Sequence, residues 1–386
     1  MSSDHKNHAL VIGASGLIGW AVVNELLSSS SSSFSHITAL VNRPLKLEDS
    51  FWPAETADGP RISLVSGVDL SSSDEEFENG LKDKVLNLES VSHVFYFAFK
   101  SDLDPINETT LNVAMMRRLI LAISNLSSNF TSFVYPGGTR GYGIYRPGGI
   151  FTAPLTEDLV DTLPPDYAAT VAYPHYRALL TAESKGKKWT WCELCPDAII
   201  GFTPNGSGFS LAGHWAVYLY CWKLIYGEGA EVPYPGTKQG YESLYSETSS
   251  GTLARVGIYA ALNPEKLAGK IVNVADSVTP GSMSERWPQI VKWFGLKGVG
   301  PKEGASVEDQ KPGEFVKENK EKLVEAGAKG VEIWNSEQLD SYGYWLTFDR
   351  QLSLKRLREA RFEEEKGPQE GWWEAFEMFK KAGMIQ

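Results

Sequence analysis

Three glycines near the start of the chain have the spacing of a dinucleotide-binding loop. Gly13, Gly16 and Gly19 stand between a short apolar run, residues 9–12, and a stretch with apolar residues at helical spacing, residues 18–27. Glycine permits a tight turn, lets backbone approach a pyrophosphate and lets a helix pack closely on a sheet. A purely structural turn is the alternative, but a strand before the loop and a helix after it favour a nucleotide. We expect the cofactor to contact Gly13, Ser15, Gly16, Leu17, Ile18 and Gly19.

The end of the second apolar run, residues 37–41, favours one cofactor over another. Enzymes that use NAD place an acidic residue here to bind the ribose 2′-hydroxyl, whereas this chain has Asn42 and Arg43. An arginine can pair with the 2′-phosphate of NADP, although a solvated surface arginine is the alternative. Asp69 and Leu70 follow the third run, and we expect the Asp69 carboxylate at the adenine amino group unless it caps a helix. The predicted cofactor is NADPH.

The elements that must position these residues alternate along the first half of the chain. Short apolar runs occupy residues 9–12, 37–41, 62–65, 91–99 and 133–135, with a helical pattern at 112–123 and further strands expected at 189–200 and 271–274. Brief apolar strands separated by helices predict an α/β fold, a Rossmann-type doubly wound parallel sheet. Residues 1–205 are expected to form mainly the NADP-binding core. Residues 206–386 are expected to form mainly a helical substrate-binding cap, interleaved with the last core strands.

The composition limits the partners and the compartment. The 386 residues include 37 Lys and Arg against 48 Asp and Glu, and this net charge of −11 argues against nucleic acid as a partner. Cys192, Cys195 and Cys221 are too few for a disulfide framework, and an odd count indicates a reducing compartment. The histidines have no ligand spacing, and no apolar stretch is long enough to span a bilayer. We therefore expect a cytoplasmic protein that holds no metal.

Several later motifs occur in an order that is typical of one family. They are HVFY at residues 93–96, PLTED at 154–158, IGFTP at 200–204, YPGTK at 234–238 and an aromatic stretch at 339–348. Together with the GxxGxxG spacing of the glycine loop, they resemble the progesterone 5β-reductase/iridoid synthase-like (PRISE) family of atypical short-chain dehydrogenases/reductases. The resemblance covers residues 8–384. It implies an enzyme, an NADPH-dependent reductase of an activated C=C bond in a lipophilic enone or enal.

The resemblance also implies how the reaction is assisted. In this family hydride reaches the β-carbon, and a tyrosine hydrogen-bonds the carbonyl oxygen that becomes an enolate. Counting back from Pro196 places this tyrosine at Tyr173, with Tyr176 as its nearest competitor and a core tyrosine as the alternative. The family motif TGRKHY reads GGTRGY here, so Arg140 stands in place of the lysine. An arginine keeps the positive charge but cannot shuttle protons as a lysine can.

The remaining contacts follow from the same resemblance. Further cofactor contacts are expected from Asn42, Ala98, Tyr173, Pro196 and Ile199. The substrate pocket is expected to contain Phe99, Lys100, Tyr142, Tyr176, Tyr342 and Trp345, although a plain loop lysine is the stronger reading of Lys100.

Two other functions stay open at this point. With its lysine replaced, the site could catalyse a carbonyl reduction, an isomerisation or a cyclisation. A non-enzymatic NADP-sensing protein would keep the glycine loop without using the tyrosine. The partner is in each case a small molecule, lipophilic for the enzyme because aromatic residues are 12% of the chain. A homodimer is compatible with the sequence but is not indicated by any pattern in it.

Overall fold

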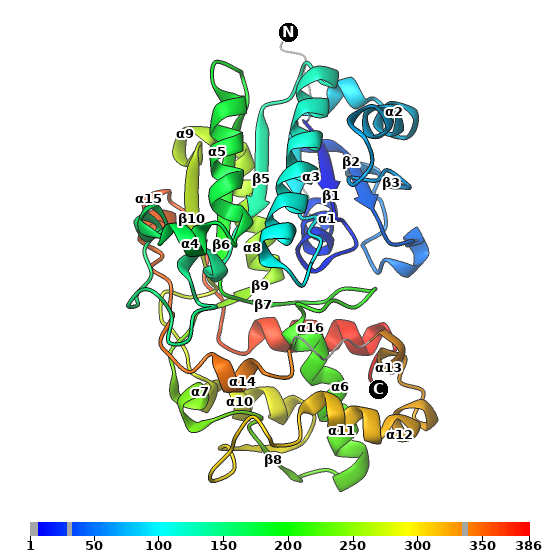
Figure 1. Ribbon diagram of the computed structural model, residues 1–386. Coiled ribbons are helices and arrows are strands. Elements are labelled where there is room, and N and C mark those ends of the chain that lie inside the picture. Colours follow the sequence, from blue (N-terminus) through cyan, green and yellow to red (C-terminus); the bar gives the residue numbers. More distant parts are fainter. Residues whose placement is uncertain (1–6, 29–32, 334–338) are drawn as a thin grey trace.

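The computed structural model describes residues 7–28, 33–333 and 339–386. Its core is a seven-stranded parallel sheet, and the carboxyl ends of the strands point towards the lower half of the molecule in Figure 1. In spatial order the strands are β10 (Lys270–Val274), β6 (Thr190–Pro196), β5 (Ser132–Pro136), β4 (His93–Tyr96), β1 (Asn7–Ile12), β2 (Phe34–Val41) and β3 (Arg61–Ser66). The chain reverses its direction of winding between β1 and β4. Ligands of open α/β sheets bind at such a switch point.

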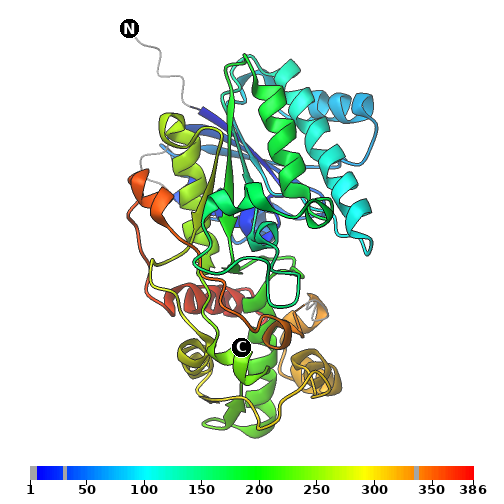
Figure 2. The ribbon, with the colours of Figure 1, turned by 60° about the vertical axis from the view of Figure 1, so that its left-hand side comes forward.

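Helices cover both faces of the sheet, which confirms the doubly wound α/β fold (Figure 2). One face carries α2 (Asp74–Lys84), α3 (Pro105–Leu126) and α5 (Ala172–Ser184), whose buried apolar side chains share one core with the sheet. The other face carries α1 (Leu17–Ser28) and α8 (Ser250–Leu262), followed by α9 (Pro264–Leu267). Strands buried on two faces are apolar throughout, which is why short apolar runs predicted them.

Two strands differ from the sequence prediction. Only His93–Tyr96 of the expected strand 91–99 pairs with its neighbours, because Phe97 and the following residues leave the sheet and turn along its carboxyl edge. The expected strand 189–200 is two strands. β6 ends at Pro196, and β7 (Ala198–Ile200) pairs with β9 (Glu247–Ser249) in a separate small sheet. Proline has no N–H to donate to a neighbouring strand, which is consistent with the end of β6 at Pro196.

The cap consists mainly of helices from the second half of the chain, below the sheet in Figure 1. Its elements are α6 (Leu211–Tyr226), β8 (Glu231–Pro233), α7 (Lys238–Glu242), α10 (Met283–Trp293), β11 (Lys297–Val299), α11 (Pro312–Glu318), α12 (Lys320–Glu325), α13 (Gly330–Ile333), α14 (Tyr342–Trp345) and α16 (Glu370–Lys381). Short elements at the joint with the core are η3 (Thr139–Tyr142), η4 (Glu157–Thr162), α4 (Pro165–Ala168) and α15 (Lys355–Glu359). Since α8 and β10 return to the core between α7 and α10, the cap and the core are interleaved.

A buried ion pair joins the cap to the small sheet of β7 and β9. Glu247, on β9, accepts from Arg286 of α10 at 2.6 Å and also from the Trp372 indole N–H of α16. Within the cap, the indole rings of Trp215 on α6 and Trp372 stack with their centroids 5.4 Å apart. Glu247 therefore ties two cap helices to β9. In the described ranges no helix is both long and apolar enough to cross a bilayer.

Candidate active site

A cavity of about 730 Å³ lies along the carboxyl edge of the sheet, between the core and the cap. This volume falls in the usual range of small-molecule and cofactor sites. It brings together many of the residues that the sequence predicted for cofactor and substrate: Gly16, Leu17, Ile18, Arg43, Ala98, Phe99, Arg140, Tyr173, Tyr176, Pro196, Ile199, Tyr342 and Trp345. The cavity therefore runs from the glycine loop to the predicted catalytic tyrosine.

The glycine loop forms one end of the cavity, and its geometry requires glycine. Gly13 has a φ of +78°, and a Cβ there would lie 2.9 Å from the carbonyl carbon of Phe97. A Cβ on Gly19 would lie 2.2 Å from the Gly13 carbonyl oxygen, so α1 packs too closely on the loop for any side chain. The carbonyl oxygen of Ser15 accepts from the Thr203 hydroxyl at 2.9 Å, which fixes the loop against the segment after β7. The first-turn N–H groups of α1 have no acceptor within the helix, and they suit a phosphate.

The predicted 2′-phosphate and adenine contacts lie at the same end, with unequal access to the cavity. Arg43 is exposed at the rim, and its Nη1 donates to the carbonyl oxygen of Asn205 at 3.2 Å. Asn42 is exposed beside it but is not among the residues that line the cavity. Asp69 is exposed and accepts from the Ser71 amide at 2.8 Å, a turn contact two residues on.

Leu70, expected to contact the cofactor, is buried in the core beneath α2 and α3. Four residues were predicted to contact the ribose and adenine: Asn42, Arg43, Asp69 and Leu70. Of these, Arg43 is the one that lines the cavity.

Tyr173 is the tyrosine that projects into the cavity from the first turn of α5. Two glycines leave room for it: a Cβ on Gly138 would lie 3.4 Å from its hydroxyl oxygen, and one on Gly141 would lie 3.0 Å from its ring. Among the described residues no hydrogen-bond partner of this hydroxyl is found, so it is free to donate to a ligand. Burial raises the pKa of Tyr173, and the nearby charge of Arg140 opposes that rise. The neutral, donating form of the hydroxyl is therefore favoured.

Arg140, at the position of the family lysine, is held by an ion pair. Its Nη1 donates to the carboxylate of Glu108 in the first turn of α3, and its Nη2 donates to the Thr170 carbonyl oxygen at 3.0 Å. The guanidinium also lies 5.1 Å from the centre of the Tyr145 ring. Burial acts to lower the pKa of Arg140, but the hydrogen bond and charge of Glu108 raise it by more, so the net shift is upward. Arg140 therefore keeps a fixed positive charge in a fixed place and links three separate segments.

A sequence profile of the PRISE-like Rossmann-fold domain matches residues 9–386. The chain belongs to the PRISE-like family. The short chain dehydrogenase ausT of Aspergillus calidoustus is 34% identical over 301 residues, covering 75% of this chain and 72% of that protein. A 3-oxo-Delta(4,5)-steroid 5-beta-reductase of Arabidopsis thaliana is 25% identical over 86% of this chain and 82% of its own length. The structure of RMD from Pseudomonas aeruginosa complexed with NADPH has a TM-score of 0.59 at 14% identity, over 97% and 100% of the two chains, and shows the fold alone.

These comparisons confirm two of the expectations from the sequence. The chain belongs to the PRISE-like family that its motifs resemble, and it is an oxidoreductase of the short-chain dehydrogenase/reductase type, as its named relatives are.

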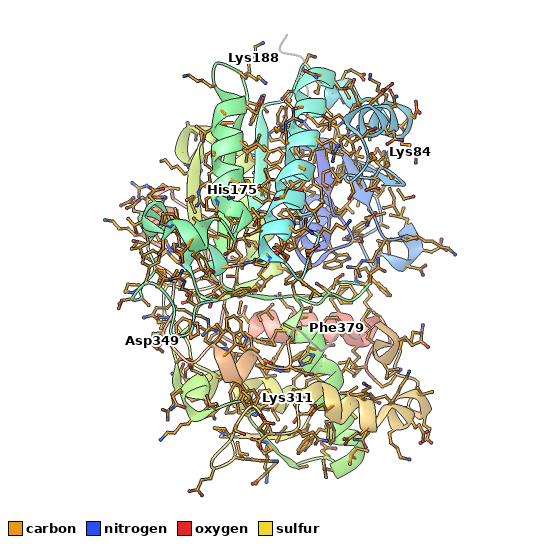
Figure 3. All side chains as sticks on the ribbon, in the orientation of Figure 1. Lys84, His175, Lys188, Lys311, Asp349 and Phe379 are labelled. Carbon is orange, nitrogen blue, oxygen red and sulfur yellow. The ribbon has the colours of Figure 1, made fainter. Side chains whose placement is uncertain are left out.

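Among the described residues of this PRISE-like chain, no other cation takes the place of the missing lysine. Arg177, four residues after Tyr173, pairs with the buried carboxylate of Glu193 at 3.0 Å and does not line the cavity. The Lys100 side chain is exposed and outside the cavity, which corrects its expected place in the substrate pocket. His175, labelled in Figure 3, is exposed on α5. Of the described basic residues, Arg43 and Arg140 are the two that line the cavity.

Tyr142 is a second residue that the structure moves out of the expected pocket. Its hydroxyl donates to Asn273 Oδ1 of β10 at 2.7 Å, and its ring is buried in a small cluster behind the cavity wall. Tyr142 ends the short helix η3 and is not among the residues that line the cavity. Tyr176 does line the cavity, but its hydroxyl is buried, and no hydrogen-bond partner is found for it among the described residues.

Three carboxylates line the cavity that the sequence did not predict there, Asp102, Glu108 and Asp197. Glu108 lies 32 positions before Arg140, and Asp197 accepts from the Thr139 hydroxyl at 2.7 Å and pairs with buried Arg350 at 3.1 Å. Arg350 in turn donates to the Tyr342 hydroxyl at 2.9 Å. A signal for Glu108 was present, because a charged arginine inside an apolar cavity requires a carboxylate partner.

Proposed function

We propose that the protein is an NADPH-dependent reductase of an activated C=C bond in a lipophilic enone or enal. The observation that supports this most is the Tyr173 hydroxyl, which faces the cavity beside the Gly138 backbone and has no partner among the described residues. The family relationship to a named steroid 5-beta-reductase supports the same reaction. Aromatic side chains in the cavity wall, among them Phe97, Phe99 and Trp345, suit an apolar skeleton.

The residues present fit a nicotinamide dinucleotide. We assign the pyrophosphate to the glycine loop and the first turn of α1, because Gly16 leaves the backbone open to the cavity. We assign the 2′-phosphate to Arg43, whose guanidinium would exchange the Asn205 carbonyl for a charged partner. The bound cofactor supplies the hydride. Titration of the protein with NADPH and with NADH tests this assignment, and tighter binding of NADPH is expected.

The chain itself would act mainly on the carbonyl oxygen of the substrate. Tyr173 donates a hydrogen bond to that oxygen, and the bond strengthens as negative charge develops on it. Arg140 adds a positive charge nearby without competing for the oxygen, because Glu108 and Thr170 hold its two terminal nitrogens. Burial strengthens both effects, since charges interact more strongly where water is excluded.

A second reaction is favoured by one observation, the ion pair that holds Arg140. An arginine that cannot release a proton gives no direct route for protonating an enolate. An enolate that persists can cyclise or isomerise, and the site would then accomplish more than a simple reduction. Analysis of the products formed with NADPH from an enal that carries a second unsaturated carbonyl group, which can accept the enolate carbon, separates these outcomes: the open-chain saturated aldehyde indicates reduction alone, and a ring product indicates cyclisation. Tight NADPH binding without consumption of NADPH by any enone, enal or ketone would favour an NADP-sensing role.

The buried thiols bear on the compartment. Cys192, Cys195 and Cys221 are all free and buried, and Cys192 and Cys195 belong to clusters on opposite faces of β6. Their reduced state fits the cytoplasm. Counting of thiols in the denatured protein should find all three.

A further inference from the structure

Four large apolar side chains lie exposed where the cavity opens to solvent. Phe99, Tyr145 and Phe209 are 39%, 48% and 47% exposed, Leu103 is fully exposed, and all four line the cavity. We call these four residues the mouth. A soluble chain that gathers exposed apolar side chains in one place presents a binding surface there. Because the mouth continues the wall of the catalytic cavity, a ligand that starts in the cavity can extend onto it.

The mouth is built from segments far apart in the sequence. The ring of Phe99, just after β4, meets the ring of Phe209, just before α6, edge to face with centroids 6.2 Å apart. On another side the ring of Tyr145 meets that of Trp345 on α14, edge to face at 5.2 Å. The core and the cap both contribute to it, and neither alone would present this surface.

The inner end of the cavity has the opposite character. Near Tyr173 it contains the charged pair of Arg140 and Glu108. The hydroxyl oxygens of Tyr96 and Tyr176 are buried in the wall, so they offer no contact to a ligand. The Tyr173 hydroxyl and the charged pair remain, and they suit a polar ligand group at this end. The cavity thus has a charged inner end, whereas the exposed apolar side chains gather at its opening, with Ser101 and Asp102 beside Leu103 and Arg43 at the rim.

The volume limits what fits inside. The same 730 Å³ includes the glycine-loop end of the cavity, which the proposed dinucleotide would occupy. Only the part between Tyr173 and the mouth then remains for the substrate. An elongated skeleton would reach the opening before its whole length was enclosed.

We infer that the substrate is an amphipathic molecule, with its enone or enal at the inner end and an elongated apolar tail that leaves through the mouth across Phe99, Leu103 and Phe209. This inference rests on the proposed function for the orientation of the head. It adds the class of substrate, long rather than compact, and the residues that select it. Leu103 and Phe209 are specificity-determining residues in this scheme, because they meet the tail and lie away from the reacting atoms.

Ligand binding tests the inference without requiring turnover. Saturated methyl ketones with unbranched tails of increasing length serve as probes, and tryptophan fluorescence reports their binding with and without NADP+. In the unaltered protein each added methylene should lower Kd about 3- to 4-fold. Leu103→Ser and Phe209→Ser should weaken the longest ketones about tenfold and leave the shortest unchanged. Leu86→Ser, which removes another exposed leucine, 68% exposed and away from the cavity, should change neither.

The outcomes separate this inference from the proposed function. Equal effects of Leu103→Ser on short and long ketones would overturn the inference while leaving reduction of short enones intact. If Leu103→Ser weakens binding of long ketones more than short ones, but the protein reduces no enone, the inference about the mouth is supported and the proposed reaction is contradicted. Sedimentation completes the test: if Leu103→Ser turned a dimer into a monomer, the mouth would be an interface between copies and the inference would be wrong.

Discussion

The two ends of the cavity are built in different ways. At the nucleotide end, residues 13–19 form one continuous segment, and its geometry is set by backbone conformation and by close approach of α1. At the reaction end, Tyr173, Arg140 and Glu108 come from α5, η3 and α3, and their geometry depends on side chains that meet across the fold. The local segment cannot take a side chain at Gly13 or Gly19, and its shape depends mainly on its own backbone. In a site assembled from separate segments, an arginine can take the place of a lysine when a carboxylate elsewhere in the fold holds the guanidinium.

The largest effect is expected at the reaction end, from loss of the Tyr173 hydroxyl. Tyr173→Phe keeps the ring but removes the donor, so kcat for NADPH-dependent enone reduction should fall about 10²- to 10³-fold with little change in KM. Tyr176→Phe is the matched control, since that hydroxyl is buried away from solvent, and its kcat should stay within about tenfold. The reverse pattern, with Tyr176→Phe the more damaged, would reassign the donor.

The strand, glycine loop and helix of the nucleotide end could be predicted from the sequence, because their signals are local, whereas the cofactor contacts expected there stay predictions. The glycine spacing and the apolar strands can each be read within one or two elements of the chain. The same holds for Arg43, which stands where an NAD enzyme has an acidic residue. The reaction end could be predicted only in part. Tyr173 follows from a motif, but the partner of Arg140 lies 32 positions away, and no local pattern connects it to Glu108. The orientation of Tyr142 was missed for the same physical reason, since its partner Asn273 is 131 positions away.

At the nucleotide end, Arg43→Ala should weaken NADPH but not NADH. A charge-assisted contact to phosphate contributes about 1.5–3 kcal/mol, so Kd for NADPH should rise about 10- to 100-fold. Arg61→Ala is the control, because Arg61 is also exposed and pairs with Glu55 at 3.2 Å outside the cavity. Calorimetric titration measures both. Equal affinities of the unaltered protein for NADPH and NADH would remove the role assigned to Arg43.

A smaller effect, on stability, is expected when the ion pair of Arg140 and Glu108 at the reaction end is broken. Glu108→Gln or Arg140→Met alone leaves a partly buried charge unpaired, and each should lower the free energy of unfolding by about 1–3 kcal/mol. The double variant should lose less than the sum of the two, and urea unfolding measures the coupling. Arg140→Lys keeps the charge and should retain more activity than Arg140→Met. Additive losses would show that the two side chains act independently.

The smallest effect concerns pH. A tyrosine donates only while protonated, and burial raises the pKa of Tyr173 above its ordinary value of about 10. The rate should therefore stay level from pH 7 to about 10 and fall only above that range. Arg140 lowers this pKa, so Arg140→Met should move the fall to still higher pH. A pH profile of kcat, limited to conditions where the protein stays folded, checks both. A fall that begins below pH 9 would contradict Tyr173 as the donor, and a shift to lower pH in Arg140→Met would contradict the role of Arg140.

The most direct test follows one hydrogen atom from the cofactor to the product. The protein is supplied with NADPH that carries deuterium at the transferable position of the nicotinamide and with an enone that bears an alkyl tail, and the product is examined by NMR. Reduction of the activated C=C bond predicts one deuterium at the former β-carbon and none at the carbonyl carbon, in a reaction that Tyr173→Phe slows about 10²- to 10³-fold. Deuterium at the carbonyl carbon, or a product that contains none, would contradict C=C reduction as the function of this protein.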